Sequence, residues 1–255
     1  MELKFFSKKV FNLILLLLFC SCSTDISKIS DNYSTEQILY LAQKSFEEKD
    51  FESAGDTYMR LSELYPYSDD GRKSLINAVK SYEKADMNEE MRFAINKFTT
   101  LYPANKNNEF LAFSLGNSYY NQIVDIERDQ GSAFNATKQF VKFLKEYPSS
   151  IYSDEVRKKN VSVNNQLSGQ EMSIGRYYLN KKKYLASIKR FQGVVKNYPK
   201  TTHYPEALFR LVEVYTILGI QDSVEKIVNK MSKEYKGSIW EKKALDVYVS
   251  NFIEG

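Results

Sequence analysis

The chain has 255 residues, of which 27% are charged, and a formal net charge of +4. A charge this small gives no argument for nucleic acid as a partner, and the mean hydropathy of −0.46 is that of an ordinary globular chain. Glycine (10) and proline (5) are scarce, which favours an all-α fold because these two residues interrupt helices.

The first segment in chain order joins a basic stretch to a short apolar run. Lysines at positions 4, 8 and 9 precede the run, which is about half the roughly 20 residues that a membrane-spanning helix needs. This pattern predicts a signal peptide over residues 1–21. It ends in Ser21-Cys22, and a small residue followed by cysteine resembles the lipobox of bacterial lipoproteins. Cys22 is therefore the expected lipid attachment site; a plain signal peptide with incidental cysteines is the alternative.

Cys22 and the residues after it indicate how the protein is anchored and in which membrane. Several acyl chains on Cys22, palmitate among them, would anchor the protein stably in a membrane. By resemblance to lipoprotein sorting in Gram-negative bacteria, Ser23 in place of aspartate favours the outer membrane. Residues 22–34 are expected to form a flexible tether. With Cys20 removed and Cys22 acylated, no thiol remains for a disulfide or a zinc site.

One motif recurs along the rest of the chain. Tyr-Pro stands at 65–66, 102–103, 147–148 and 198–199, and Tyr235 ends a fifth copy without proline. An aromatic residue upstream accompanies each copy, usually 17 residues after one terminal tyrosine and 20 before the next, which gives a period of 37. These upstream residues are Phe46, Tyr82, Tyr119, Tyr178 and Tyr215.

Each copy predicts two helices. In the second helix, apolar residues 11, 7 and 4 positions before the terminal tyrosine form one stripe, and the proline after the tyrosine ends the helix. The expected second helices are 51–65, 89–102, 132–147, 184–198 and 222–235, and typical first helices are 36–48 and 205–218. Helix pairs at this period are typical of tetratricopeptide (TPR) repeats. We expect an all-α, TPR-like solenoid of about five pairs and a terminal helix over 239–253.

Two insertions interrupt the period. Fourteen extra residues before the fourth copy equal about four helical turns, which predicts one long helix over 153–179. Eight extra residues in the third copy form a loop over 120–130. We group the repeats into 35–148 (repeats one to three) and 149–255 (repeats four and five with the terminal helix). Gly116 and Gly175, each three residues before a repeat tyrosine, are expected to let paired helices approach closely.

No motif for chemistry accompanies the repeats. There is no nucleophile with a base, no phosphate-binding loop and no zinc-binding motif. The inserted loop carries Asp125, Glu127 and Asp129 around Arg128, which we interpret as solvated charge rather than a calcium loop. We therefore expect no catalytic residue, no metal and no cofactor, and hence no enzyme.

Three segments resemble one family. "YNQIVDIERDQ" at 120–130, "EMSIGRYYLNKKKYLASIKRF" at 171–191 and "TTHYPEALFRLVEVYTILG" at 201–219, together with the lipobox and the repeats, resemble the BamD family of the outer-membrane β-barrel assembly machinery. The resemblance implies a non-enzymatic scaffold, lipid-anchored on the periplasmic face of the outer membrane. It also implies three kinds of partner: a BamA-like barrel subunit, other lipoproteins of the complex, and unfolded outer-membrane proteins.

The resemblance further implies roles for the two halves of the chain. The N-terminal repeats would receive client peptides, and the C-terminal repeats would dock on the periplasmic domains of the barrel subunit. Candidate client residues, which alternatively only pack the repeat core, are Phe46, Tyr58, Tyr82 and Tyr119. Candidate docking residues are Arg176, Tyr177 and Arg190.

Two other functions are open to a repeat protein of this kind. One is another periplasmic TPR adaptor, for instance one that coordinates cell-wall synthesis; Cys22 and the lack of a heptad segment weigh against it. The other is a solenoid fused to an enzyme, for which the repeats leave no room.

Overall fold

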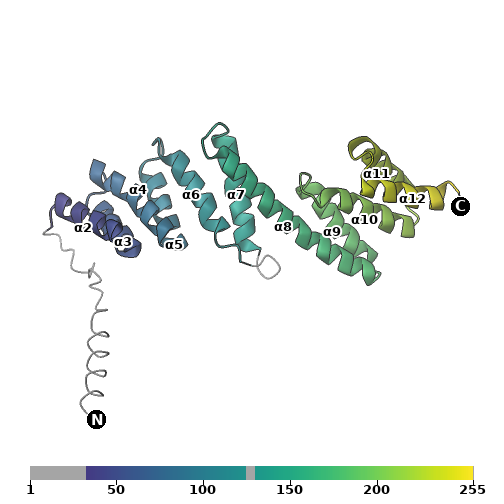
Figure 1. The fold of residues 1–255 in the computed structure, drawn as a ribbon, viewed down its shortest axis with the longest axis horizontal. Coiled ribbons are helices and arrows are strands. Elements are labelled where there is room, and N and C mark those ends of the chain that lie inside the picture. The colour runs from purple at the N-terminus through teal and green to yellow at the C-terminus, as the bar shows by residue number, and fades with distance from the viewer. Residues whose placement is uncertain (1–32, 125–129, 255) are drawn as a thin grey trace, which may run out of the picture. The chain divides into compact units, whose positions relative to one another are not determined.

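The computed structural model describes residues 33–124 and 130–254 (Figure 1). Within these ranges the chain forms eleven helices and no strand, which confirms the all-α prediction. The expected signal peptide, Cys22, nearly all of the tether and the carboxylates of the inserted loop lie outside these ranges. Among the described helices, none combines the length and the apolar character needed to cross a bilayer.

The helices form five consecutive pairs and a terminal helix, as expected for a TPR-like repeat. Every expected boundary lies within one residue of the observed one. The helices are α2 (Thr35–Glu47), α3 (Phe51–Leu64), α4 (Asp69–Lys84), α5 (Asn88–Leu101), α6 (Asn108–Tyr120), α7 (Gly131–Glu146), α8 (Ser153–Asn180), α9 (Tyr184–Asn197), α10 (Tyr204–Ile217), α11 (Gln221–Glu234) and α12 (Ile239–Phe252).

The apolar stripe of the second helices is buried as predicted. Its most exposed member, Tyr58, is 7% exposed, and all the others are 4% or less. The set, in chain order, is Ala54, Tyr58, Leu61, Met91, Ile95, Phe98, Ala136, Phe140, Phe143, Ser187, Phe191, Val194, Val224, Val228 and Met231. The terminal tyrosine after each of these helices has φ between −129° and −135° and lies outside the helix. The stripe therefore forms the core of every repeat.

The turn between paired helices fixes the register of the repeats. In the second, fourth and fifth repeats, the carbonyl of the upstream tyrosine accepts a 2.9 Å hydrogen bond from the N–H five residues later, as Tyr82 does from Met87. In the first repeat this acceptor is the carbonyl of Ser45, which accepts a hydrogen bond from the N–H of Asp50. Ser45, rather than Phe46, thus occupies the register of Tyr82, and Phe46 lies one position further along the helix.

The paired helices approach closely at two glycines, as predicted. A side chain at Gly116 would collide with the Phe140 ring, and one at Gly175 would collide with the Phe191 ring. In both pairs the ring belongs to the stripe of the second helix. Glycine is needed here because the ring occupies the space that a β-carbon would fill.

The described chain divides into two compact units after Pro103. The first unit holds α2 to α5 and the second holds α6 to α12. This division differs from the grouping at 148/149, since the third repeat packs with the fourth. The first half of α8 packs on α7, where Val156 joins the cluster of Phe140 and Phe143, and its second half packs on α9 through Met172. One continuous helix, predicted from the insertion length, therefore serves both repeats.

Candidate functional site

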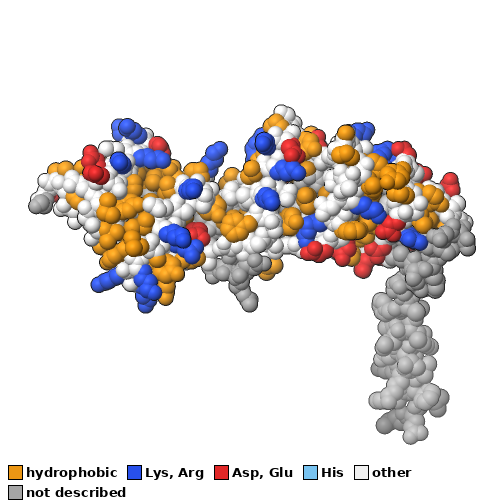
Figure 2. Space-filling view, turned by 180° about the vertical axis from the view of Figure 1, so that it is seen from behind, with side chains coloured by type: hydrophobic (Ala, Val, Ile, Leu, Met, Phe, Trp, Pro, Cys, Tyr) orange, Lys and Arg blue, Asp and Glu red, His pale blue; other side chains and the backbone are white. Residues whose placement is uncertain are grey.

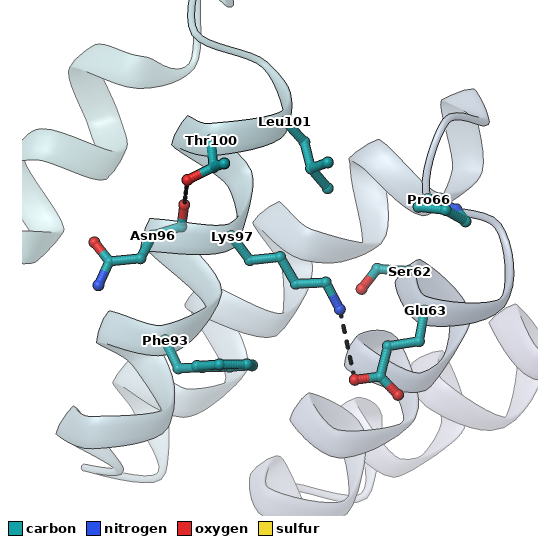
Figure 3. A pocket seen from close by; sticks show the side chains of 8 residues that line it. All are labelled: Ser62, Glu63, Pro66, Phe93, Asn96, Lys97, Thr100 and Leu101. Carbon is teal, nitrogen blue, oxygen red and sulfur yellow. Dashed lines mark hydrogen bonds and ion pairs between the residues drawn. The ribbon is translucent and has the colours of Figure 1, made fainter.

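Two adjoining hollows lie between α3 and α5 in the first unit (Figure 3). Their volumes are about 550 and 470 Å³, and both are lined by Glu63 and Phe93. We call them together the α3–α5 groove. Figure 3 shows that the residues of the first hollow come from the facing helices α3 and α5 and, at Pro66, from the turn after α3.

The floor of the groove is apolar. Phe93 is 61% exposed, and its ring lies in the space between α5 and α3 (Figure 3). Pro66 and Leu101 line one end of the same groove. A large aromatic side chain that stays this exposed beside a hollow is the kind of residue that anchors binding partners.

The rim of the groove is largely acidic. Lys97 Nζ lies 3.5 Å from Glu63 Oε1 and offsets that charge. The charged residues of the second hollow are all carboxylates, Glu63, Glu89 and Glu90. Glu89 pairs with Arg92, whereas Glu90 makes no ion pair within the described chain. Figure 2 shows acidic side chains along one edge of this unit. The rim therefore favours a segment that carries lysine or arginine.

Tyr82 forms a wall of the groove. Its side chain is 3% exposed, and its hydroxyl donates a 2.7 Å hydrogen bond to Asp56 Oδ1. Burial raises the pKa of Tyr82 well above its usual value, and the bond to Asp56 and the charges of Glu90 and Glu63 raise it further. The hydroxyl thus stays protonated at neutral pH and holds α4 to α3.

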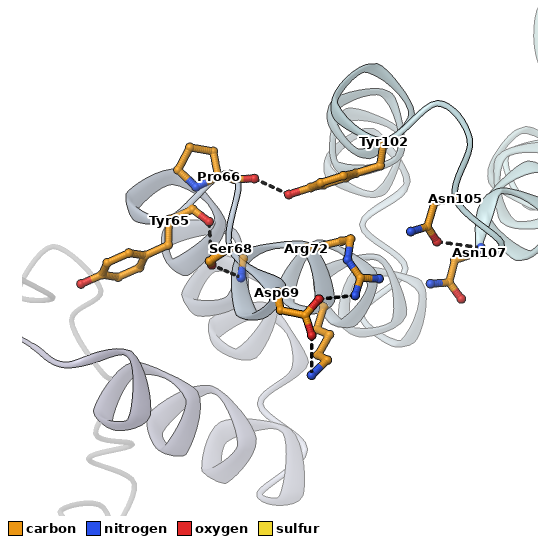
Figure 4. A network of polar contacts seen from close by, with 10 residues as sticks. Tyr65, Pro66, Ser68, Asp69, Arg72, Tyr102, Asn105 and Asn107 are labelled. Carbon is orange, nitrogen blue, oxygen red and sulfur yellow. Dashed lines mark hydrogen bonds and ion pairs between the residues drawn. The ribbon is translucent and has the colours of Figure 1, made fainter.

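Polar contacts close the end of the groove at the first Tyr-Pro turn (Figure 4). The Tyr102 hydroxyl, at the end of α5, donates a hydrogen bond to the Pro66 carbonyl. Ser68 Oγ donates to the Tyr65 carbonyl at 2.9 Å and accepts from the N–H of Gly71 at 2.9 Å. These bonds fix the turn between α3 and α4 against the end of α5, so that the width of the groove is set by the repeat motif itself.

The structure places the four candidate client residues differently from one another. Tyr82 lines the groove, and Tyr58 is buried in the stripe beside it. Phe46 is half-buried, with its ring 5.2 Å from that of Phe51. Tyr119 belongs to the second unit, where it is half-buried against the Phe140 cluster. Their role in client binding stays a prediction.

The candidate docking residues lie on α8 and α9. Arg176 forms an ion pair with Glu206 of α10 at 3.0 Å, and Arg190 pairs with Glu171 of α8 at 3.0 Å. Tyr177 is 58% exposed, with its ring edge against Tyr178. The two arginines thus connect neighbouring helices, while Tyr177 presents an aromatic surface. Their role in docking also stays a prediction.

Sequence reasoning missed Phe93, Glu63 and Lys97. None of them belongs to the apolar stripe, so each resembles an ordinary surface position of its helix. The one available signal was Phe93 itself, a large aromatic residue two positions after Met91 of the stripe and therefore on another face of the helix.

Comparison with known proteins gives a consistent set of relatives. Residues 31–231 match the YfiO family model, described as outer membrane lipoprotein. The chain is 32% identical over 187 residues to a Caulobacter vibrioides protein, and the aligned region covers 73% of this chain and 61% of the relative. It is 32% identical over 194 residues to a Rickettsia prowazekii protein, and the aligned region covers 76% of this chain and 77% of the relative. Both relatives are named outer membrane protein assembly factor BamD.

Proposed function

We propose, because this chain belongs to the BamD family of outer membrane lipoproteins, that it is a scaffold subunit of the machinery that assembles β-barrel proteins into the outer membrane. The observation that carries this proposal is the 32% identity, over 73% of the chain, to a protein named as an assembly factor. The scaffold acts by binding rather than by catalysis.

The α3–α5 groove is the proposed client-binding site. An unfolded barrel segment exposes apolar side chains that will later face lipid, and Phe93 offers such a side chain an aromatic contact. The described residues contain no strand, so a client strand finds no exposed sheet edge to pair with and aggregation is limited. The acidic rim selects segments with a neighbouring lysine or arginine. Tyr82, one of the predicted client residues, supplies the wall.

The anchor and the partner surface complete the proposal. Acylated Cys22 holds the protein at the periplasmic face of the outer membrane, and residues 23–34 separate the repeats from the lipid. The C-terminal repeats dock on the periplasmic domains of a BamA-like subunit, with Tyr177 as the exposed contact. Other lipoproteins of the complex bind the same scaffold.

Depletion of the protein in its own cells tests this function. We expect the amount of folded, heat-modifiable barrel protein in the outer membrane to fall, and a tagged copy extracted in detergent to recover a large barrel protein with periplasmic domains. A Cys22→Ala variant should be lost from the membrane fraction, and it should not restore barrel assembly in the depleted cells.

Two results would contradict the proposal. One is an unchanged level of folded barrel proteins after depletion. The other is recovery of cell-wall enzymes without a barrel partner, which would instead support a periplasmic TPR adaptor of another pathway.

A further inference from the structure

A second groove lies in the second unit, between α9, α10 and α11. It has a volume of about 330 Å³, and we call it the α9–α11 groove. Leu208 and Leu211, both at most 3% exposed, form its floor, and Val195 and Ile227 are partly buried beside them. A closed apolar cavity of about 150 Å³ is enough to hold benzene, so the groove has room for one large apolar side chain.

The second groove occupies the same repeat positions as the first. Both lie between successive second helices, and both are lined by the tyrosine 20 residues before the terminal tyrosine, Tyr82 in one and Tyr215 in the other. The residue five positions before the terminal tyrosine is a lysine in both, Lys97 and Lys230. The second groove is therefore the repeat counterpart of the first.

The charge of the lining residues differs between the two grooves. The register of Phe93, nine positions before the terminal tyrosine, holds Lys226 in the second groove. The register of Glu63 holds Lys196, which is outside the lining of that groove. The charged residues that line the α9–α11 groove are two lysines, with no carboxylate. Lys230 Nζ donates to the Tyr204 hydroxyl at 2.7 Å and lies 3.9 Å from Glu234. Lys226 is exposed and makes no ion pair within the described chain.

We propose that the α9–α11 groove binds a polypeptide segment that places a large apolar side chain next to an aspartate or glutamate. The apolar side chain lies over Leu208 and Leu211, and the carboxylate lies beside Lys226. Charge complementarity selects this occupant, because the rim is cationic while the floor is apolar. The inference extends the proposed function by naming the chemistry of a second bound segment, and it takes its biological meaning from that function.

Binding of labelled peptides to the full-length lipoprotein in a neutral detergent tests the inference. The probe is a short soluble peptide with one phenylalanine flanked by aspartates; its matched partner has lysines in place of the aspartates. We expect Lys226→Glu to weaken binding of the aspartate peptide about tenfold and to leave binding of the lysine peptide, which the acidic rim of the α3–α5 groove favours, unchanged. Lys233→Glu makes the same charge change on an exposed residue of α11 outside the groove, and it should weaken binding less than twofold. Far-UV circular dichroism checks that both variants are folded.

Three outcomes would overturn the inference. The first is an equal loss of affinity for the two peptides in Lys226→Glu, and the second is an equal loss of affinity for the aspartate peptide in Lys226→Glu and Lys233→Glu. The third is binding of anionic phosphatidylglycerol vesicles, weakened by Lys226→Glu, without binding of either peptide, which would make the groove a lipid site. Depletion in cells reads out barrel assembly instead, so the peptide result and the proposed function can fail separately.

Discussion

The α3–α5 groove and the α9–α11 groove are built from the same repeat positions but carry opposite charge. In the repeat that contributes the later helix of each groove, the stripe residue four positions before the terminal tyrosine is buried, as Phe98 and as Met231. Phe93 in the lining of the first groove corresponds to Lys226 in the lining of the second, whereas the register of Glu63 holds Lys196, which is outside the lining of the second groove. The repeat thus fixes the shape of the groove through its core, whereas the rim positions are free to set which segment binds.

The lysine five positions before the terminal tyrosine, Lys97 in one groove and Lys230 in the other, has different partners in the two grooves. Lys97 is offset by Glu63 across the groove, while Lys230 faces the hydroxyl of Tyr204. The hydrogen bond to Tyr204 raises the pKa of Lys230, so its ammonium charge is retained. The same residue type therefore neutralises an acidic rim in one unit and adds to a basic rim in the other.

The largest expected effect comes from removing the shared core. We expect Phe98→Ala to lower the free energy of unfolding by about 3–5 kcal/mol and Met231→Ala to lower it by about 2–5 kcal/mol, because each leaves a cavity in the stripe. Urea unfolding followed by circular dichroism measures both. A loss below about 1 kcal/mol in either variant would show that the two positions do not play the same part.

Exchange of the rim residues should produce a smaller effect, on binding rather than on stability. In the double variant Phe93→Lys with Lys226→Phe, we expect the first groove to lose about tenfold in affinity for the lysine-flanked phenylalanine peptide and the second to lose as much for the aspartate peptide. Both positions are exposed, so stability should change by about 0.5 kcal/mol or less.

The single variants serve as controls for the exchange. Phe93→Lys alone should leave binding of the aspartate peptide unchanged, and Lys226→Phe alone should leave binding of the lysine peptide unchanged. If either single variant weakens both peptides, the grooves are not separate sites and the comparison fails.

The smallest effect concerns the Tyr82 wall. Tyr82→Phe removes the bond to Asp56, which should cost about 0.5–1.5 kcal/mol at neutral pH. Because the pKa of folded Tyr82 is raised above that of the unfolded chain, its contribution is complete below about pH 10 and declines at higher pH as the unfolded tyrosine loses its proton. The stability of the variant should therefore approach that of the natural chain in alkaline solution.

Thermal unfolding from about pH 8 to about pH 11 measures this convergence. Asp56→Asn is the matched control, since it keeps an acceptor for the hydroxyl but removes the charge. It should cost less than Tyr82→Phe at neutral pH. A constant difference between Tyr82→Phe and the natural chain over the whole range would show that Tyr82 does not titrate differently in the folded state.

Much of the fold follows from the sequence because helix periodicity is local. The stripe, the helix boundaries and the long α8 all depend on spacing along one helix. The register of the first repeat was wrong by one position because Ser45 and Phe46 are neighbours, and a shift of one residue turns a side chain by about 100°. The hydrogen bond from the N–H of Asp50 to the carbonyl of Ser45, and the burial of Ser45, distinguish the two.

The grooves could not be predicted in the same way, because they depend on pairs of helices. Phe93 of α5 lines its hollow together with residues of α3, and the ion pair of Arg190 with Glu171 joins residues of two helices. Likewise, the first four repeats all end in a Tyr-Pro turn, so the motif alone does not indicate that the first unit ends at Pro103.

The long helix α8 has a consequence for how the second unit unfolds. In a repeat protein each repeat contributes its own stability and one interface with each neighbour, so repeats can melt one by one from an end. The 28 residues of α8 belong to the cores of both the third and the fourth repeat. Melting either one exposes half of a helix that the other requires. These two repeats are therefore expected to unfold as a single cooperative unit. In hydrogen exchange, the amides in the two halves of α8 should show the same free energy of opening rather than two different values.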